Sequence, residues 1–196
     1  MAPSDTRIAA IAAEQFHAHG ITSTGVDTVS RAAGISKRTL YERFGSKDAL
    51  IAAAYDTLDG PVFEMFTGRA EATADDPPAQ IDRLFAQLEV MVALPEFRGC
   101  PFANASSELA DPSHPAHAVV RRHKERLRRW IRARARAAGA TDPEGLSRRL
   151  MVVFAGGQAQ ALVLRSVQPA TDARAAARAL VDAAVADSTA DDGRTA

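Results

Sequence analysis

The sequence predicts an all-α protein. Alanine is abundant and aromatic residues make up only 6% of the 196 residues, a composition that favours helix. Apolar residues recur at three- and four-residue intervals in segment after segment, and no segment alternates as a strand does. Glycine, proline and capping residues separate the segments. We therefore expect a small N-terminal group of short helices and a larger C-terminal group of longer ones.

The first two helices are predicted from their ends. Apolar residues at positions 8, 11, 12 and 16 share one face of a helix that Ser4 or Asp5 can cap. Gly20 can adopt the left-handed conformation that ends a helix. Thr24 and Asp27 then resemble a capping box, which predicts a short second helix with one buried apolar face.

A third short helix follows a tight turn. Gly34 ends the second helix, Ser36 caps the third, and Gly45 stops it. Ser46 then caps a fourth helix. Helix, tight turn and helix follow one another within about fifty residues, which is the order of a helix-turn-helix unit.

The rest of the chain is expected to form further helices. The helix from Ser46 to Leu58 should be interrupted at Gly60–Pro61, because proline lacks the N–H that an inner helical turn requires. We expect domains at 1–50 and 51–187, followed by a polar, disordered tail at 188–196. The later helices are predicted at about 63–70, 80–94, 101–109, 115–138, 143–167 and 171–186.

The charge of the chain is local rather than global. The whole chain is neutral, which argues against a general nucleic-acid or membrane-surface binder. Residues 31–47 carry a net charge of +4, whereas residues 51–100 carry −6. A confined basic region beside an acidic one predicts an anion-binding surface on an otherwise neutral body.

Other features limit the class of protein. The single cysteine, Cys100, excludes a disulfide framework and a thiolate metal cage. We find no signal peptide and no run of about eighteen apolar residues, so we expect a cytoplasmic protein. No cofactor and no metal site are predicted: His114-x-x-His117 near Asp111 is broken by two prolines, and Cys100 has no evident catalytic partners.

The third predicted helix has the side chains of a DNA-reading helix. Leu40 and Phe44 would hold it to the small core, which turns its N-terminal side chains toward base edges in a major groove. Arginine and lysine can donate to guanine, and threonine can contact a thymine methyl group or a phosphate. Lys47 and the amides at the Ser46 cap suit a phosphate. The predicted DNA-contacting residues are Thr24, Thr28, Ser36, Lys37, Arg38, Thr39, Tyr41 and Lys47.

This N-terminal region resembles the TetR (tetracycline-repressor-like) family. The resemblance covers residues 7–52 and rests on the motif A-x-x-x-F-x-x-x-G ending at Gly20, followed by T-G-V-D-T-V-S-R-A-A-G-I-S-K-R-T-L-Y-E-R-F-G-S-K-D-A-L. Val29 and Ser30 replace the more usual Ile-Ala, and Gly45 stands where proline or a polar residue is common. These departures affect no predicted reading residue.

The resemblance implies a ligand-responsive transcriptional regulator that is not an enzyme, most often a repressor. It implies a helical C-terminal domain that binds a small-molecule effector and forms a homodimer through its last two helices. The run G-C-P-F-A-N-A-S-S-E-L at 99–109 also resembles a stretch of some subgroups. Two reading helices about 34 Å apart match successive turns of the major groove, so the expected partner is palindromic double-stranded operator DNA.

The last two predicted helices have faces that could pair with a second chain. Residues 150–164 carry an apolar stripe, Gly156 and Gly157 permit close approach of another helix, and the final helix is rich in alanine and valine. Two such helices from each of two chains can form a four-helix interface. The same stripes could equally pack within one chain.

A pocket for the effector is expected on the inner faces of the middle helices, because apolar walls with a few polar groups are typical of such cavities. The same residues could instead form packed core. His123 shares a stripe with Leu127 and Trp130, so it is either a pocket group or a satisfied core histidine. The predicted ligand-binding residues are Phe63, Phe66, Phe85, Leu88, Met91, Phe102, Asn104, Ser107, His123, Trp130, Phe154 and Gln158.

Three alternatives remain open. A regulator without a ligand, or a partner-binding module, predicts a filled core at 60–165. A helical enzyme predicts a cluster of catalytic residues, which the sequence does not contain. Residues 121–136 carry a net charge of +8, and we expect a solvated helix face that pairs with the acidic region rather than a second DNA surface.

Overall fold

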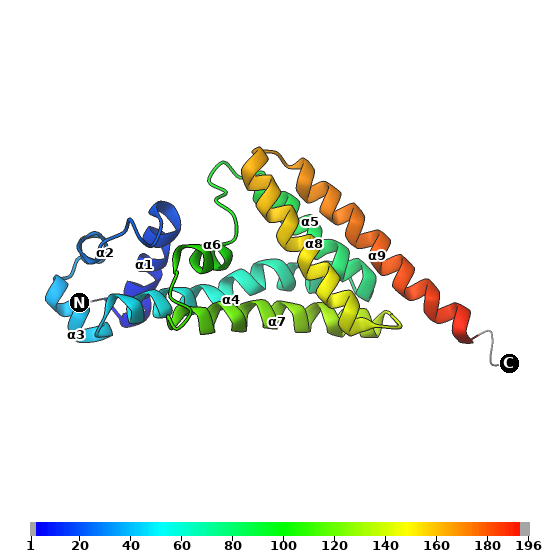
Figure 1. Ribbon diagram of the computed structural model, residues 1–196, viewed down its shortest axis with the longest axis horizontal. Coiled ribbons are helices and arrows are strands. Elements are labelled where there is room, and N and C mark those ends of the chain that lie inside the picture. The colour runs from blue at the N-terminus through cyan, green and yellow to red at the C-terminus, as the bar shows by residue number, and fades with distance from the viewer. Residues whose placement is uncertain (1–2, 193–196) are drawn as a thin grey trace. The chain divides into compact units, whose positions relative to one another are not determined.

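The structure, a computed structural model, describes the backbone of residues 3–192 and the side chains of 3–72 and 74–186. Within these residues the chain forms nine helices and no strand (Figure 1), which confirms the all-α prediction. The helices are α1 (Asp5–His19), α2 (Val26–Ala33), α3 (Lys37–Phe44), α4 (Lys47–Thr73), α5 (Pro77–Val92), α6 (Pro101–Glu108), α7 (Ala116–Ala137), α8 (Pro143–Leu164) and α9 (Gln168–Asp192).

The chain divides into two compact units. The first consists of residues up to Val62 together with Cys100–Lys124, and the second consists of Phe63–Gly99 together with the chain from Glu125 onward. The first unit contains the whole of the predicted DNA-binding domain and adds α6 and the beginnings of the helices α4 and α7 to it. The predicted domain boundary at residue 50 stays a prediction.

Most of the short N-terminal helices end where the sequence predicts. The Ser4 hydroxyl caps α1 by accepting from the Arg7 N–H. Gly20 and Gly34 have φ values of 87° and 67°, which glycine adopts without strain. The predicted capping box is wrong, because Gly25 holds the cap position of α2 and makes no side-chain bond there.

The third helix, α3, is also bounded as predicted. The Ser36 hydroxyl accepts from the Thr39 N–H at 3.0 Å, and Gly45 ends the helix with a φ of 76°. The Ser46 hydroxyl then accepts from the Ala49 N–H at 3.0 Å at the start of α4. The two turns flanking α3 are therefore fixed by local sequence.

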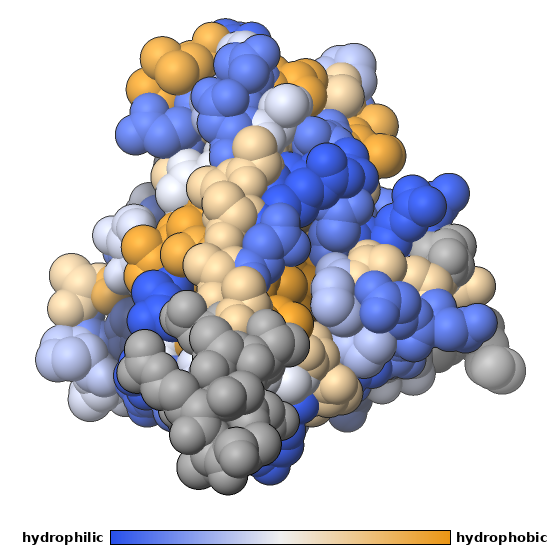
Figure 2. Space-filling view, turned by 90° about the vertical axis from the view of Figure 1, so that its right-hand side faces the viewer, coloured by the Kyte–Doolittle hydropathy of each residue, from blue (hydrophilic) through white to orange (hydrophobic). Residues whose placement is uncertain are grey.

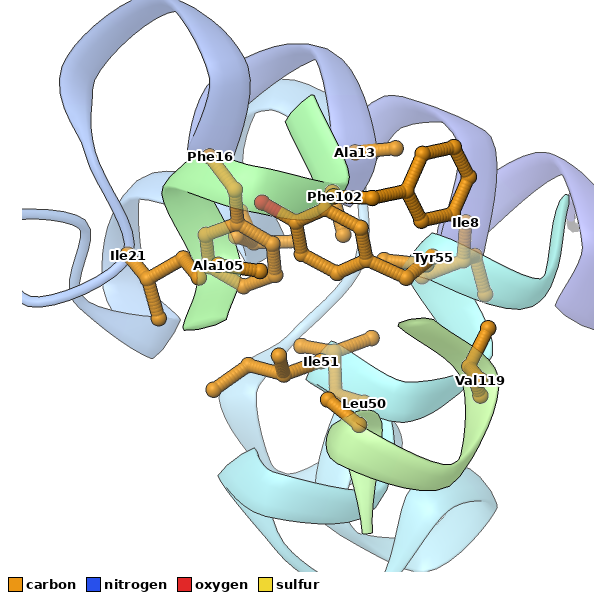
Figure 3. Close-up of a cluster of buried hydrophobic side chains, with 14 of the residues drawn as sticks. Ile8, Ala13, Phe16, Ile21, Leu50, Ile51, Tyr55, Phe102, Ala105 and Val119 are labelled. Carbon is orange, nitrogen blue, oxygen red and sulfur yellow. The ribbon is translucent and has the colours of Figure 1, made fainter. Parts of the chain in front are cut away.

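The first unit has an apolar core to which α1, α4, α6 and α7 contribute. Figure 3 shows Tyr55 of α4 near Phe16 of α1 and Phe102 of α6. The rings of Tyr55 and Phe102 meet edge to face with centroids 5.9 Å apart. Leu40 of α3 is fully buried in the same core. Burial of Leu40 fixes which face of α3 remains exposed.

Three boundaries differ from the sequence prediction. Helix α4 continues through Pro61, which lies exposed, so the proline does not end the helix even though it removes one backbone bond. Helix α5 begins at Pro77, since Asp76 caps it through the Ala79 N–H and proline is tolerated in a first turn. Helix α9 continues to Asp192, beyond the predicted end near Ala186; residues 193–196 of the predicted tail lie outside the described residues.

In the second unit, α5, α8 and α9 pack side by side (Figure 1). A Cβ at Gly157 of α8 would come within 2.7 Å of the Ala173 side chain of α9. The absence of a side chain at Gly157 therefore allows α8 and α9 to approach closely. At Gly156 a Cβ would meet nothing within 4 Å, so the second glycine does not serve this contact.

An ion-pair network also joins α5 to α9. Arg174 of α9 donates to both carboxylate oxygens of Asp82 and to Glu89 at 2.7–2.8 Å. Arg178, one turn later, donates to the same Asp82 at 2.6 and 3.0 Å. Burial alone would raise the pKa of Asp82, but the hydrogen bonds from the two arginines outweigh it and hold that pKa well below its usual range.

Candidate nucleic-acid interface and effector region

The exposed face of α3 carries most of the predicted DNA-contacting side chains. Arg38 has 88% of its side chain exposed and Lys37 has 53%. Tyr41 is also exposed, whereas Leu40 is buried beneath them. Lys37 and Arg38 occupy the first turn of α3, the part of a recognition helix that contacts base edges.

Both basic side chains form weak pairs that a DNA ligand could replace. The Lys37 ammonium lies 3.2 Å from a carboxylate oxygen of Asp27, and Arg38 donates to Glu42 at 2.8 Å on the same helix. All four side chains are more than half exposed. Exposed ion pairs contribute about 0–1 kcal/mol, so their loss costs little.

Ser36 and Thr39 shape the start of α3. Their hydroxyl oxygens lie 2.8 Å apart, and the Ser36 oxygen also accepts from the Thr39 N–H. Ser36 is exposed, whereas Thr39 is half-buried. The Ser36 hydroxyl therefore has a structural role at the cap, whatever it contacts in a complex.

Three other predicted contacts lie away from this exposed face. Thr24 is buried, and its hydroxyl donates to the Gly20 carbonyl at 2.6 Å, so we leave it out of the proposed DNA-contacting set. Thr28 of α2 is half-buried. The Lys47 ammonium is half-buried and donates to the Ile21 carbonyl at 3.0 Å, which it would have to release to reach a phosphate.

The twelve predicted ligand-binding residues are divided between the two units. The first unit holds four of them and the second holds eight. Those of the first unit are Phe102, Asn104, Ser107 and His123; those of the second are Phe63, Phe66, Phe85, Leu88, Met91, Trp130, Phe154 and Gln158.

In the first unit, His123 is bound on two sides. Its ring stacks on Phe102 with centroids 3.7 Å apart, and its Nδ1 lies 2.7 Å from a carboxylate oxygen of Asp59. Both His123 and Phe102 are buried. Ser107 is exposed, and its hydroxyl donates to the Ala103 carbonyl within α6. These contacts favour the core alternative for His123.

In the second unit, three aromatic rings form a cluster. Phe154 of α8 meets Phe66 of α4 and Phe85 of α5 edge to face, with centroids 5.2 and 5.5 Å apart. Leu88 is also fully buried, whereas Met91 is half-buried. The cluster is packed in the way that aromatic cores prefer.

Gln158 lies one turn after Phe154 on α8 and is the polar exception in this region. Its side chain is only 4% exposed, yet its amide oxygen has no hydrogen-bond partner among the described residues. Trp130 differs, because its indole N–H donates to Glu71 at 2.7 Å. Buried acceptors are normally paired, so Gln158 stands out as a candidate contact for a bound molecule.

Part of the basic run on α7 pairs with acids of residues 51–100, as predicted. Arg122 bonds Asp56 within the first unit. Arg134 bonds Glu71 within the second. Some arginines of this run are therefore already paired with acids, so the run as a whole is not a free anion-binding surface.

The histidine and cysteine motifs also have protein partners. His114 Nδ1 accepts from the Ala116 N–H, and His117 Nε2 donates to the Leu109 carbonyl at 3.1 Å. The Lys124 ammonium lies 3.3 Å from the sulfur of Cys100. Among the residues with described side chains, no group of three or more His, Cys, Asp or Glu is arranged to hold a metal. No described helix is both long and apolar enough to cross a membrane.

One residue that holds a turn of the first unit was not predicted from the sequence. Glu108 of α6 accepts from the backbone N–H groups of Ile21 and Thr22. A glutamate at the end of a short helix gives no local signal of a partner more than eighty positions away. The contact is visible only in the folded chain.

The exposed first turn of α3, set after α2 and a glycine turn, defines a helix-turn-helix DNA-binding regulator with an added helical domain. Residues 8–54 match the family model of bacterial regulatory proteins of the tetR family, and residues 77–177 match that of the tetracyclin repressor-like C-terminal domain. The second match alone covers just over half of the chain. The chain belongs to the TetR family of DNA-binding transcriptional regulators, which confirms the resemblance.

Solved structures agree with this assignment. SCO4454, a TetR-family transcriptional regulator from Streptomyces coelicolor, is 26% identical with a TM-score of 0.83, over 93% of this chain and 91% of that one. The TetR-type regulator sav143 from Streptomyces avermitilis is 31% identical with a TM-score of 0.78, over 93% of this chain and 98% of that one.

A shorter stretch of the chain is similar in sequence to a Mycobacterium tuberculosis protein named as a mycofactocin biosynthesis transcriptional regulator, MftR. The two are 49% identical over 43 residues, which is 22% of each chain.

Proposed function

We propose that this regulator is a homodimeric repressor that binds a palindromic operator and is released by a small-molecule effector. The observation that carries the DNA-binding part is the exposed first turn of α3, where Lys37 and Arg38 stand above a buried Leu40. A protein that reads chromosomal DNA has to be in the same compartment as that DNA, so we also propose a cytoplasmic location. We further propose that the protein has no enzymatic activity.

The dimer part of the proposal is supported by an exposed apolar surface on α8. Val152 and Val163 are each 73% exposed, and Leu164 is 62% exposed. Figure 2, which faces the side at the right of Figure 1, has a central band of weakly to strongly hydrophobic surface between hydrophilic areas. Exposed apolar patches of this kind are typical of protein interfaces, and a second copy of α8 and α9 is the occupant expected in this family.

The effector part of the proposal is supported by Gln158. A buried acceptor without a partner costs about 1–3 kcal/mol, and a ligand N–H or O–H would offset that cost. The neighbouring Phe154 belongs to an aromatic cluster, so a ligand there would be largely apolar with at least one donor. A ligand that binds one arrangement of the protein better than another shifts the population of reading-competent dimers.

The experiment that tests the function is selection of bound fragments from random duplex DNA by the purified full chain. We expect a palindrome whose half-site centres are about 10 base pairs apart, or a multiple of that spacing. An enriched asymmetric site would contradict the symmetric dimer. No enrichment at modest salt would falsify the DNA-reading role.

Arg38→Ala is expected to lower operator affinity by about 1–3 kcal/mol, because a base-edge contact is lost. The measurement is fluorescence anisotropy with the selected operator and with single-base variants of it. Base preference should relax at one position of each half-site. Arg83→Ala, an exposed change on α5 of the second unit, is the control, and equal losses in the two variants would remove Arg38 from the reading set.

Val163→Asp is expected to convert the dimer to a monomer, since a charge placed in an apolar interface stays unpaired. Sedimentation equilibrium at micromolar protein measures the mass directly. Val90→Asp is the matched control, because Val90 is also exposed but lies on α5. A dimer that survives Val163→Asp and dissociates with Val90→Asp would move the interface to α5.

An alternative is a regulator that senses no small molecule. Gln158→Leu distinguishes the two, because it fills the site without a polar atom. A regulator that senses no small molecule should keep its operator affinity in this variant, and neither the variant nor the wild type should respond to small molecules from cell extracts. Loss of an effector response with retained DNA binding would support the ligand role of Gln158.

A further inference from the structure

The turn between α1 and α2 is held by a carboxylate from a distant helix. One oxygen of Glu108, the last residue of α6, accepts from the Ile21 N–H at 2.6 Å and from the Thr22 N–H at 3.2 Å. The Thr22 hydroxyl lies 3.4 Å from the same oxygen. Charge-assisted bonds of this kind are shorter and stronger than neutral ones.

The turn is shaped to receive this carboxylate. Gly20 has a φ of 87°, and a Cβ there would lie 3.1 Å from the bound oxygen of Glu108. Any side chain at Gly20 would therefore strain the backbone and crowd the carboxylate. Figure 3 shows Ile21 of the turn beside Ala105 of α6, and both are buried.

A second charged side chain holds the same turn through its carbonyl. The Lys47 ammonium, at the start of α4, donates to the Ile21 carbonyl at 3.0 Å. Both the N–H and the C=O of Ile21 are thus bound by charged side chains, one from α6 and one from α4. Such a clamp fixes the two peptide planes on either side of the Ile21 Cα and hence the direction in which the chain enters α2.

The helix that carries Glu108 is itself anchored. The Leu109 carbonyl, next to Glu108, accepts from His117 of α7 at 3.1 Å. On the buried side of α6, Phe102 and Ala105 are fully buried in the core of the first unit. Glu108 is therefore a fixed point rather than a mobile surface side chain.

We propose that Glu108 is a positioning residue for the DNA-reading helix. By binding the Ile21 and Thr22 amides it sets the orientation of α2, which packs against both α1 and α3. Any change that withdraws the end of α6 removes this constraint and lets α2 and α3 reorient together. The proposal rests on the proposed DNA-reading function. It adds that α6 positions the reading helix through Glu108.

The test compares Glu108→Met with wild type in the full chain. Methionine keeps the length of the side chain but removes the charge and both oxygens that could accept from the Ile21 and Thr22 amides. We expect amide hydrogen exchange at Ile21 and Thr22 to rise about tenfold, and affinity for the selected operator to fall about tenfold. Affinity for random duplex should stay within about twofold, because phosphate contacts do not require the correct orientation of α3.

The ratio of operator to random-duplex affinity separates positioning from simple loss of stability. A merely destabilised protein loses active molecules and therefore binds both duplexes less by the same factor. Glu96→Met, an exposed change in the loop after α5, is the control and should alter nothing. If Glu108→Met does not fold, Glu108→Asp keeps the charge on a shorter side chain and should show the same change in ratio to a smaller degree.

The outcomes are distinct. Faster exchange at Ile21 and Thr22 with an unchanged affinity ratio would overturn the positioning role while the DNA-reading function stands. Unchanged exchange would overturn the proposal as well, because the carboxylate would then not hold the turn. A wild-type protein that prefers no duplex would overturn the proposed function itself.

Discussion

Replacing Phe154 by alanine is expected to lower the free energy of unfolding by about 3–5 kcal/mol. The ring is 2% exposed and meets Phe66 and Phe85 edge to face. Its removal forfeits both aromatic contacts and leaves a cavity that the surrounding helices cannot fill. Urea unfolding followed by circular dichroism measures the change.

Phe154→Leu serves as the matched control because it retains most of the buried volume. We expect a loss of about 1–2 kcal/mol for this variant. A loss below about 1 kcal/mol for Phe154→Ala would mean that the ring faces a hollow rather than packed neighbours. The same pair of variants therefore distinguishes a packed core from an open effector pocket at this position.

Replacing Arg174 by methionine is expected to lower the free energy of unfolding by about 2–3 kcal/mol at neutral pH. Arg174 pairs with Asp82 and Glu89, and all three side chains are about one-fifth exposed. The variant removes the cation that Asp82 and Glu89 share, and Asp82 keeps only the more exposed Arg178. Breaking a fully buried pair costs about 3–5 kcal/mol, and partial exposure reduces that figure.

Arg178→Met tests the role of burial, since Arg178 pairs with the same Asp82 but is 57% exposed. We expect it to cost less than about 1 kcal/mol. Equal losses for the two variants would contradict the idea that burial decides the strength of this network.

The effect of Arg174→Met should depend on pH. The pKa of Asp82 is lowered in the folded protein, so the pair stabilises the fold above the ordinary aspartate pKa of about 3.9 and stops doing so as pH falls through the folded value. The difference between wild type and Arg174→Met should therefore shrink below about pH 4. A constant difference from pH 7 to pH 3 would show that the lost arginine acted through packing alone.

The parts of the fold that the sequence predicts well are those set by neighbouring residues. The hydroxyl of Ser36 caps α3, and Gly20, Gly34 and Gly45 adopt the positive φ angles that end short helices. These signals act over three or four positions and need no knowledge of the rest of the chain. They predicted the bounds of α3.

The parts that the sequence could not predict depend on distant packing. Pro61 removes one backbone hydrogen bond from α4, yet the helix continues through it. Threonine often caps helices or contacts DNA, yet the hydroxyl of Thr24 donates to the Gly20 carbonyl within the turn. Glu108 gains its role only because α6 folds against a turn more than eighty residues earlier.

The predicted effector residues show the same limit. Helical periodicity identifies buried faces, and nearly all of the twelve residues are at least half-buried, Ser107 being exposed. Periodicity does not say which buried faces belong together, and the structure divides them between two units. Among the twelve, Gln158 has a buried amide oxygen without a hydrogen-bond partner in the described part of the chain, and its proposed role depends on that oxygen.

The pairing of Arg38 with Glu42 has a consequence for how the protein would search a genome. A neutral pair gains little from the phosphate field of arbitrary sequence, so brief encounters would end quickly. Under the proposed DNA-reading role of Arg38, a guanine edge at the operator would take the place of the Glu42 carboxylate. Glu42 would then shorten the time that the protein spends on other sequences.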